Sequence, residues 1–224
     1  MKKMKLVGKW FVPDYEENLR ILTAVENEDW GCKETLKKSF KYLEKFHTAI
    51  DVGTWIGDST SIIAQQFQNT IGFEANTDVF ECCQKNLKNF KNILLYNFAL
   101  SNSVEEKKLF LGNTTFSAWI NSLEQSQIIN KSVVEKKIQC QTLDSFNFKN
   151  IDFLKIDIDS HEGYFLQGCQ IFFKNNSPVI LIEYKPKIRD RQNISMPDPI
   201  QLLTSIGYKI KEKVSHIDYV LTRE

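Results

Sequence analysis

The stretch Asp51-Val-Gly-Thr-Trp-Ile-Gly-Asp-Ser59 constrains the fold of this 224-residue chain more than any other. It follows the apolar pair Ala49-Ile50 and precedes a helical apolar pattern over residues 61–67. A strand, a glycine-bearing turn and a helix in this order are typical of a ligand-binding loop in a doubly wound sheet. Glycine lets such a turn bend sharply and approach a ligand closely. We therefore expect an α/β domain with a ligand at this turn.

Short apolar runs and amphipathic segments alternate through the rest of the chain. They predict strands over 47–52, 70–74, 92–96, 151–156 and 178–183, and helices over 58–68, 77–89 and 162–174. Strands separated by helices pair in parallel through right-handed crossovers. Residues 208–214 and 216–221 are expected to close the sheet as an antiparallel pair. The expected fold class is therefore α/β, with a doubly wound, Rossmann-like, seven-stranded sheet, helices on both faces and an antiparallel last strand.

Two segments fall outside this alternation. Residues 1–46 are expected to form an N-terminal extension, irregular up to residue 28 and then helical with Asp29 as its cap. The main domain is expected over 47–224, with an insertion at about 101–143 that begins and ends in the strands Lys107–Leu111 and Lys137–Leu143. We expect these strands to form a hairpin whose polar tip contains Trp119.

The composition excludes several classes of protein. A formal net charge of +1 does not suit a whole-protein nucleic-acid binder, and no apolar run is long enough to span a bilayer. The five cysteines lack metal-ligand spacing, so we interpret them as reduced thiols in a cytoplasmic protein. We expect no nucleic-acid or membrane partner, while homo-oligomer formation stays open.

Two acids indicate the ligand at the turn, because each ends a predicted strand. Asp51 ends the first strand and suits the ammonium group of a methionine tail, or alternatively braces the glycine loop. Glu74 ends the second strand, where nucleotide-binding folds place an acid on the ribose hydroxyls. Trp55 stands where a dinucleotide motif has its second glycine, which disfavours a pyrophosphate. The combination predicts S-adenosylmethionine (SAM) as cofactor.

A second group of polar residues follows the strand over 151–156, which should adjoin the first strand of the sheet. His161 is expected to act as a general base, with Asp157 or Asp159 orienting the imidazole or the acceptor, unless His161 merely begins the next helix. Acids beside a histidine can also hold a divalent metal, but no spacing here is specific for one, and we expect none. Glu183 ends the next strand and is expected to contact the acceptor or brace the cleft.

In their order along the chain, these blocks resemble the FkbM family of SAM-dependent methyltransferases from about residue 48 to residue 185. The most specific match is Asp152-Phe-Leu-Lys-Ile-Asp-Ile-Asp-Ser-His-Glu-Gly163, supported by Gly72-Phe-Glu-Ala-Asn76, Thr142-Leu-Asp144 and Pro178–Glu183. Thr54-Trp55, Ala75-Asn76 and Asp159-Ser160 depart from the family pattern. The resemblance implies methyl transfer from SAM to a hydroxyl of a small metabolite, sugar or glycan.

The chemistry of the residues and the resemblance together lead to a set of expected roles. Cofactor contacts are expected from Asp51, Gly53, Thr54, Gly57, Ser59, Glu74, Ala75, Asn97, Ala99 and Asp157. Catalysis is expected from His161, Asp157 and Asp159, and acceptor contacts from Glu183 and Trp119. Two alternatives stay open: an NAD-linked or nucleotide-sugar oxidoreductase, and a catalytically silent SAM-fold binding module.

Overall fold

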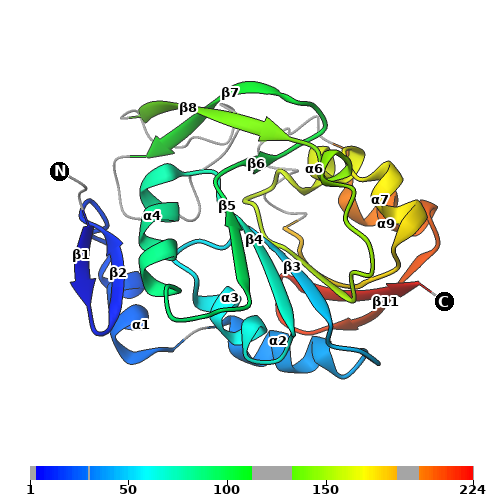
Figure 1. The fold of residues 1–224 in the computed structure, drawn as a ribbon, viewed down its shortest axis with the longest axis horizontal. Coiled ribbons are helices and arrows are strands. Elements are labelled where there is room, and N and C mark those ends of the chain that lie inside the picture. The colour runs from blue at the N-terminus through cyan, green and yellow to red at the C-terminus, as the bar shows by residue number, and fades with distance from the viewer. Residues whose placement is uncertain (1–3, 30, 113–132, 186–196, 224) are drawn as a thin grey trace.

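The structure is a computed structural model that describes residues 4–29, 31–112, 133–185 and 197–223. A mixed β-sheet lies at its centre (Figure 1). Its seven strands have the order β11-β12-β10-β9-β3-β4-β5. The parallel part comprises β3 (Thr48–Val52), β4 (Asn69–Phe73), β5 (Ile93–Tyr96), β9 (Phe153–Ile156) and β10 (Val179–Glu183). Strand β12 (Asp218–Arg223) runs antiparallel to both β10 and β11 (Tyr208–Lys213). The predicted fold class is confirmed, including the antiparallel last strand.

Helices cover both faces of this sheet because the buried strands are apolar on both sides. Ile180 and Ile182 of β10 pack with α6 (Glu162–Gln167), α7 (Gln170–Asn175) and α9 (Pro199–Ser205). Val179 and Leu181 point to the other face, which α2 (Cys32–Phe40) and α3 (Asp58–Ala64) cover. The two groups of helices lie on opposite sides of the sheet in Figure 1. Among the described residues, every helix is too short or too polar to cross a membrane.

The N-terminal segment is more regular than predicted. Strands β1 (Met4–Val7) and β2 (Trp10–Pro13) form an antiparallel hairpin, and α1 (Leu19–Asn27) follows. The Asn18 side chain caps α1 by accepting from two backbone N–H groups. The hairpin packs against α4 (Thr77–Asn86), as Figure 1 shows. The prediction that Asp29 caps the next helix is wrong, because α2 begins at Cys32 after Gly31.

The predicted inserted hairpin is present as β7 (Glu105–Gly112) and β8 (Val133–Gln141), which pair antiparallel. Strand β6 (Ala99–Leu100) adds to β8 in parallel, and the 3-10 helix η2 (Leu143–Phe146) follows. In Figure 1 the hairpin lies across the top of the view, between α4 and α6. The tip with Trp119 lies outside the described residues.

The single helix predicted over 162–174 is in fact two helices, α6 and α7, interrupted at Gly168. A Cβ atom at Gly168 would lie 2.1 Å from the carbonyl oxygen of Ser101. The interruption therefore accompanies a close backbone approach between the helix region and the segment after β6.

Candidate functional site

A cavity lies at the carboxyl ends of β3, β4 and β9. The chain leaves β3 to form β4 on one side and returns to form β9 on the other, which makes this edge the topological switch point of the sheet. Eight of the residues predicted for the site line this cavity: Gly53, Ser59, Glu74, Ala75, Ala99, Asp157, Asp159 and His161. Sequence motifs that are more than 100 residues apart therefore meet at one place.

Four predicted cofactor residues stand behind the cavity wall instead: Asp51, Thr54, Gly57 and Asn97. Asn97 donates from its side-chain amide to the carbonyl oxygen of Glu74 at 2.7 Å. Gly57 has φ +98° at the start of α3, where a Cβ would lie 2.8 Å from the Leu87 side chain. In the structure these residues shape the loops that carry the lining residues.

The turn after β3 is hydrogen-bonded to β4 and lies close to the end of β9. The backbone N–H groups of Gly53 and Thr54 donate to the carbonyl oxygen of Phe73 in β4, at 3.0 and 3.1 Å. Gly53 has φ +87°, and a Cβ there would lie 1.9 Å from the carbonyl oxygen of Asp157. Glycine is thus required by the approach of the turn to the end of β9, in addition to the positive φ.

Glu74 is held by the backbone around it. Its carboxylate accepts from the N–H of Trp55 at 3.0 Å and from the N–H of Asn76 at 2.8 Å. Trp55 reaches this position with φ +47°, which is uncommon for a residue other than glycine. Burial raises the pKa of Glu74 to about 7, although the two N–H donors oppose the rise. Each carboxylate oxygen keeps a further lone pair, so the fixed group suits a pair of hydroxyl donors.

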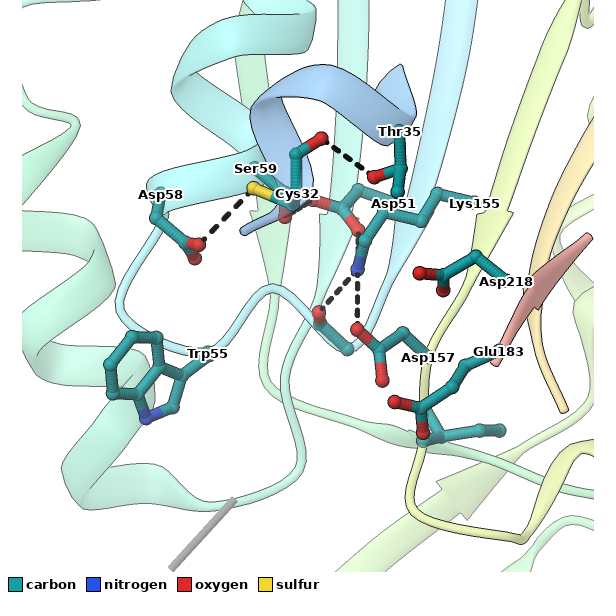
Figure 2. Close-up of polar contacts among 12 residues, drawn as sticks. Cys32, Thr35, Asp51, Trp55, Asp58, Ser59, Lys155, Asp157, Glu183 and Asp218 are labelled. Atoms are coloured by element: carbon teal, nitrogen blue, oxygen red, sulfur yellow. Dashed lines mark hydrogen bonds and ion pairs between the residues drawn. The ribbon is translucent and has the colours of Figure 1, made fainter. Parts of the chain in front are cut away.

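Asp51 is fully buried and its hydrogen bonds are made within the chain. The hydroxyl groups of Ser59 and Thr60 both donate to its Oδ2 at 2.8 Å. The ammonium nitrogen of Lys155 lies 3.2 Å from its Oδ1. Figure 2 shows the two side chains beside each other. This arrangement matches the loop-bracing alternative for Asp51. Asp58, at the start of α3, lines the cavity instead, and burial raises its pKa to about 6.

Carboxyl groups crowd the ends of β9 and β10. Burial, reinforced by the neighbouring acid Asp157, raises the pKa of Glu183 to about 8 and that of Glu162 to about 7. Burial also raises the pKa of Asp159 well above its usual value. Lys185 forms an ion pair with Glu183. In the described part of the chain, no three His, Cys, Asp or Glu side chains are arranged to hold a metal ion.

A second cavity, of about 380 Å³, lies on the other side of Lys155. Cys32, Lys155 and Asp157 line both cavities, so the two adjoin at these side chains. Glu183 and Asp218 contribute further carboxyl groups to the second cavity. Figure 2 shows Asp157, Glu183 and Asp218 on the side of Lys155 away from Asp58. The sequence motifs did not indicate Cys32 or Asp218, which lie in a predicted helix and a predicted strand outside those motifs.

His161 is 3% exposed and immediately precedes α6. Its Nε2 lies 3.0 Å from the hydroxyl oxygen of Ser101. Burial lowers the pKa of the imidazole to about 3, so the ring is neutral at physiological pH. A neutral ring with so low a pKa is a weak proton acceptor. The position matches the alternative in which His161 begins the helix, although the residue also lines the first cavity.

Comparisons with known proteins agree with this architecture. The family described as the methyltransferase FkbM domain matches residues 51–210. Among solved structures, the fold is similar to the methyltransferase FkbM from Methylobacillus flagellatus KT, with a TM-score of 0.54 and 17% identity. That alignment covers 94% of this chain and 55% of the other, so the chain spans about half the length of that relative.

A second similar structure is the magnesium protoporphyrin IX methyltransferase (ChlM) from Synechocystis PCC 6803 with bound SAM. Its TM-score is 0.51 at 11% identity, covering 93% of this chain and 86% of the other. At such identities the likeness concerns the fold alone. No protein with a curated description matches the sequence.

Proposed function

The chain belongs to the methyltransferase FkbM family, and from this premise we propose that it transfers a methyl group from SAM to a hydroxyl group of a small metabolite, sugar or glycan. The observation that carries the proposal is the chemistry of the first cavity. Its polar lining includes the carboxyl groups of Asp58, Glu74, Asp157 and Asp159, while its only cationic side chain among the described residues, Lys155, is already paired with acids.

This lining suits SAM. The cofactor has a cationic sulfonium, an ammonium group and a ribose diol, all of which are complementary to carboxylates. A dinucleotide would bring two phosphate groups against the same acids, which disfavours the oxidoreductase alternative. When bound, SAM supplies an electrophilic methyl group on its sulfonium sulfur.

Different residues of the first cavity would bind different parts of the cofactor. Glu74 would accept hydrogen bonds from the ribose diol, because its carboxylate is already fixed by two backbone N–H groups. Phe98, Ala99 and Leu100 give the cavity an apolar wall that suits the adenine ring. Asp58 is the carboxyl group that the glycine turn presents to the cavity, so it replaces the buried Asp51 as our candidate for the ammonium group.

We place the acceptor in the second cavity. It adjoins the first at Asp157, and its carboxyl groups accept hydrogen bonds from hydroxyl donors. Glu183 is the proposed acceptor-contacting residue. Methylation of a hydroxyl requires loss of its proton, and Asp159, which lines the adjoining first cavity, is our candidate to accept it. Asp157 would orient the hydroxyl, and His161 would act as a neutral hydrogen-bonding partner.

A panel of melting experiments tests the cofactor class. A ligand that binds only the native protein at about 100 times its Kd stabilises it by about 2.7 kcal/mol. SAM and its demethylated product should each raise the melting temperature, whereas NAD and NADP should not. Stabilisation by NAD alone would overturn the proposal. Transfer of a labelled methyl group to members of a sugar and glycan panel then tests O-methylation, and labelling of only nitrogen-containing acceptors would contradict it.

A further inference from the structure

Lys155 is a charged residue in the centre of a buried strand. It is 4% exposed, and the other residues of β9, Phe153, Leu154 and Ile156, are fully buried and apolar. Burial lowers the pKa of its ammonium group, but the surrounding carboxylates, Asp51 first among them, more than offset this effect and hold the pKa well above its usual value. The side chain is therefore a permanent cation at the base of the site.

The ammonium group has three N–H donors and lies near three oxygen atoms. Its nitrogen is 3.2 Å from Oδ1 of Asp51, 3.3 Å from the carbonyl oxygen of Gly53 and 3.4 Å from Oδ2 of Asp157. Figure 2 shows the Lys155 nitrogen between Asp51 and Asp157. Asp51 is its cross-strand partner in the parallel pairing of β3 with β9. One side chain therefore connects the first strand, the glycine turn and the end of the fourth parallel strand.

The three contacts have different consequences. The contact with Asp51 neutralises a buried carboxylate, and the stability of the fold is sufficient to explain it. Gly53 and Asp157, in contrast, both line the first cavity, and Asp157 also lines the second. The Asp157 side chain is 44% exposed, so folding does not require a cation beside it. The contacts with Gly53 and Asp157 thus lie where the cofactor and the acceptor would meet.

We propose that Lys155 is a positioning residue of the cofactor site, whose ammonium group holds the Gly53 carbonyl and the Asp157 carboxylate in place between the two cavities. The proposal rests on the proposed function in assigning the first cavity to SAM. It assigns to Lys155 no contact with the cofactor itself. The residue acts through the shape of the glycine turn and the direction of the Asp157 carboxylate.

Four proteins separate this role from simple charge compensation: the wild type, Asp51→Asn, Lys155→Met and the double variant. Lys155→Met alone leaves Asp51 buried without its cation, so it should lower stability and is ambiguous by itself. The double variant removes both charges, and the asparagine introduced at position 51 keeps an oxygen that can accept from Ser59 and Thr60. Urea unfolding measures stability, calorimetry measures SAM affinity, and amide hydrogen exchange in cofactor-free protein reports on residues 53–57.

The double variant should recover most of the stability that Lys155→Met loses. It should nevertheless bind SAM at least ~10-fold more weakly than Asp51→Asn, which corresponds to one lost hydrogen bond to a charged group. Amides of residues 53–57 should also exchange at least ~10-fold faster in the double variant than in Asp51→Asn, while those of β4 should be unchanged.

Two results would overturn the proposal. If the double variant binds SAM within ~2-fold of Asp51→Asn and exchanges at the same rate, Lys155 only compensates the charge of Asp51. If the double variant does not recover stability, the contacts serve the fold itself. Absence of SAM binding in the wild type would instead refute the proposed function, and the exchange measurement on cofactor-free protein would still test whether Lys155 holds the turn.

Discussion

The cofactor side and the acceptor side of the site differ in the partners and pKa values of their carboxyl groups. On the cofactor side, formed by the ends of β3 and β4, Asp51 accepts two hydroxyl hydrogen bonds and Glu74 accepts two backbone N–H bonds. On the acceptor side, formed by the ends of β9 and β10, the pKa values of Asp159 and Glu183 are raised by burial and by neighbouring acids, with Lys185 as the adjacent cation.

This difference indicates two kinds of binding surface. The cofactor side is preorganised, because its donors and acceptors are fixed by the chain before any ligand arrives. Among the described residues, the acceptor side carries more buried carboxyl groups than Lys185 can neutralise, so it is complementary to a ligand that brings hydrogen-bond donors. Changes on the cofactor side should therefore alter SAM affinity, whereas changes on the acceptor side should alter turnover.

The largest effect is expected where the two halves touch, at Gly53. A Cβ at this position would lie 1.9 Å from the carbonyl oxygen of Asp157, and the residue has a positive φ. Gly53→Val should therefore destabilise the protein by about 3 kcal/mol or more, because both backbone strain and a backbone collision must be relieved. Gly31→Ala is the matched control for stability, since a Cβ there has nothing within 4 Å. Circular dichroism melts measure both variants, and an unchanged melting temperature for Gly53→Val would refute the described turn geometry.

The next largest effect is expected from a comparison of two variants, one on the cofactor side and one on the acceptor side. Glu74→Ala should weaken SAM binding at least ~10-fold, because it removes the proposed ribose acceptor and also leaves two backbone N–H groups without their partner. Glu183→Gln, at the end of β10, should leave the Kd for SAM within ~2-fold of the wild type and lower turnover. Calorimetry on the folded variants measures both affinities. Equal losses in the two variants would mean that the halves do not work separately.

A pH dependence is expected on the cofactor side. Burial raises the pKa of Glu74 to about 7, so its carboxyl group is largely protonated at pH 6 and ionised at pH 8. SAM affinity should therefore rise from pH 6 to pH 8, by up to ~10-fold per pH unit below the pKa. In Glu74→Gln the dependence should be much flatter. Calorimetric titrations at both pH values measure it, and a wild-type affinity that falls with pH would contradict the assignment.

The smallest effect concerns His161, which lines the first cavity. Because burial lowers its pKa to about 3, the imidazole should stay neutral from pH 5.5 to pH 8. The ring resonances of His161, assigned by comparison with His161→Ala, should not shift in a nuclear magnetic resonance titration over this range. A titration midpoint near 6.5 would restore the expectation of an ordinary general base.

Local patterns predicted much of this architecture. Short apolar runs that end in glycine or an acid predicted the parallel strands and the positions of Gly53 and Glu74. Such a pattern involves only residues that are neighbours in the sequence. The break at Gly168 was not predictable, because it depends on the approach of the backbone at Ser101. The three contacts of Lys155 depend on the register of β3 against β9 and were likewise beyond local reasoning.

The N-terminal hairpin was missed for a related reason. Strands β1 and β2 are 4 residues each, too short to show periodicity, and β2 ends in Pro13. Their stability comes from packing against α4, far along the chain. The second cavity also combines distant segments, since Thr35 and Asp218 meet there although no motif connects them.

We propose that the cavity at the ends of β3 and β4 binds SAM. Calorimetric titration of the purified chain with SAM, and separately with NAD, tests it most directly. We expect saturable binding of SAM at one site per chain and no measurable binding of NAD, because carboxyl groups line the cavity and Lys155 is already paired with acids. Saturable binding of NAD without binding of SAM would contradict the assignment of this cavity to SAM.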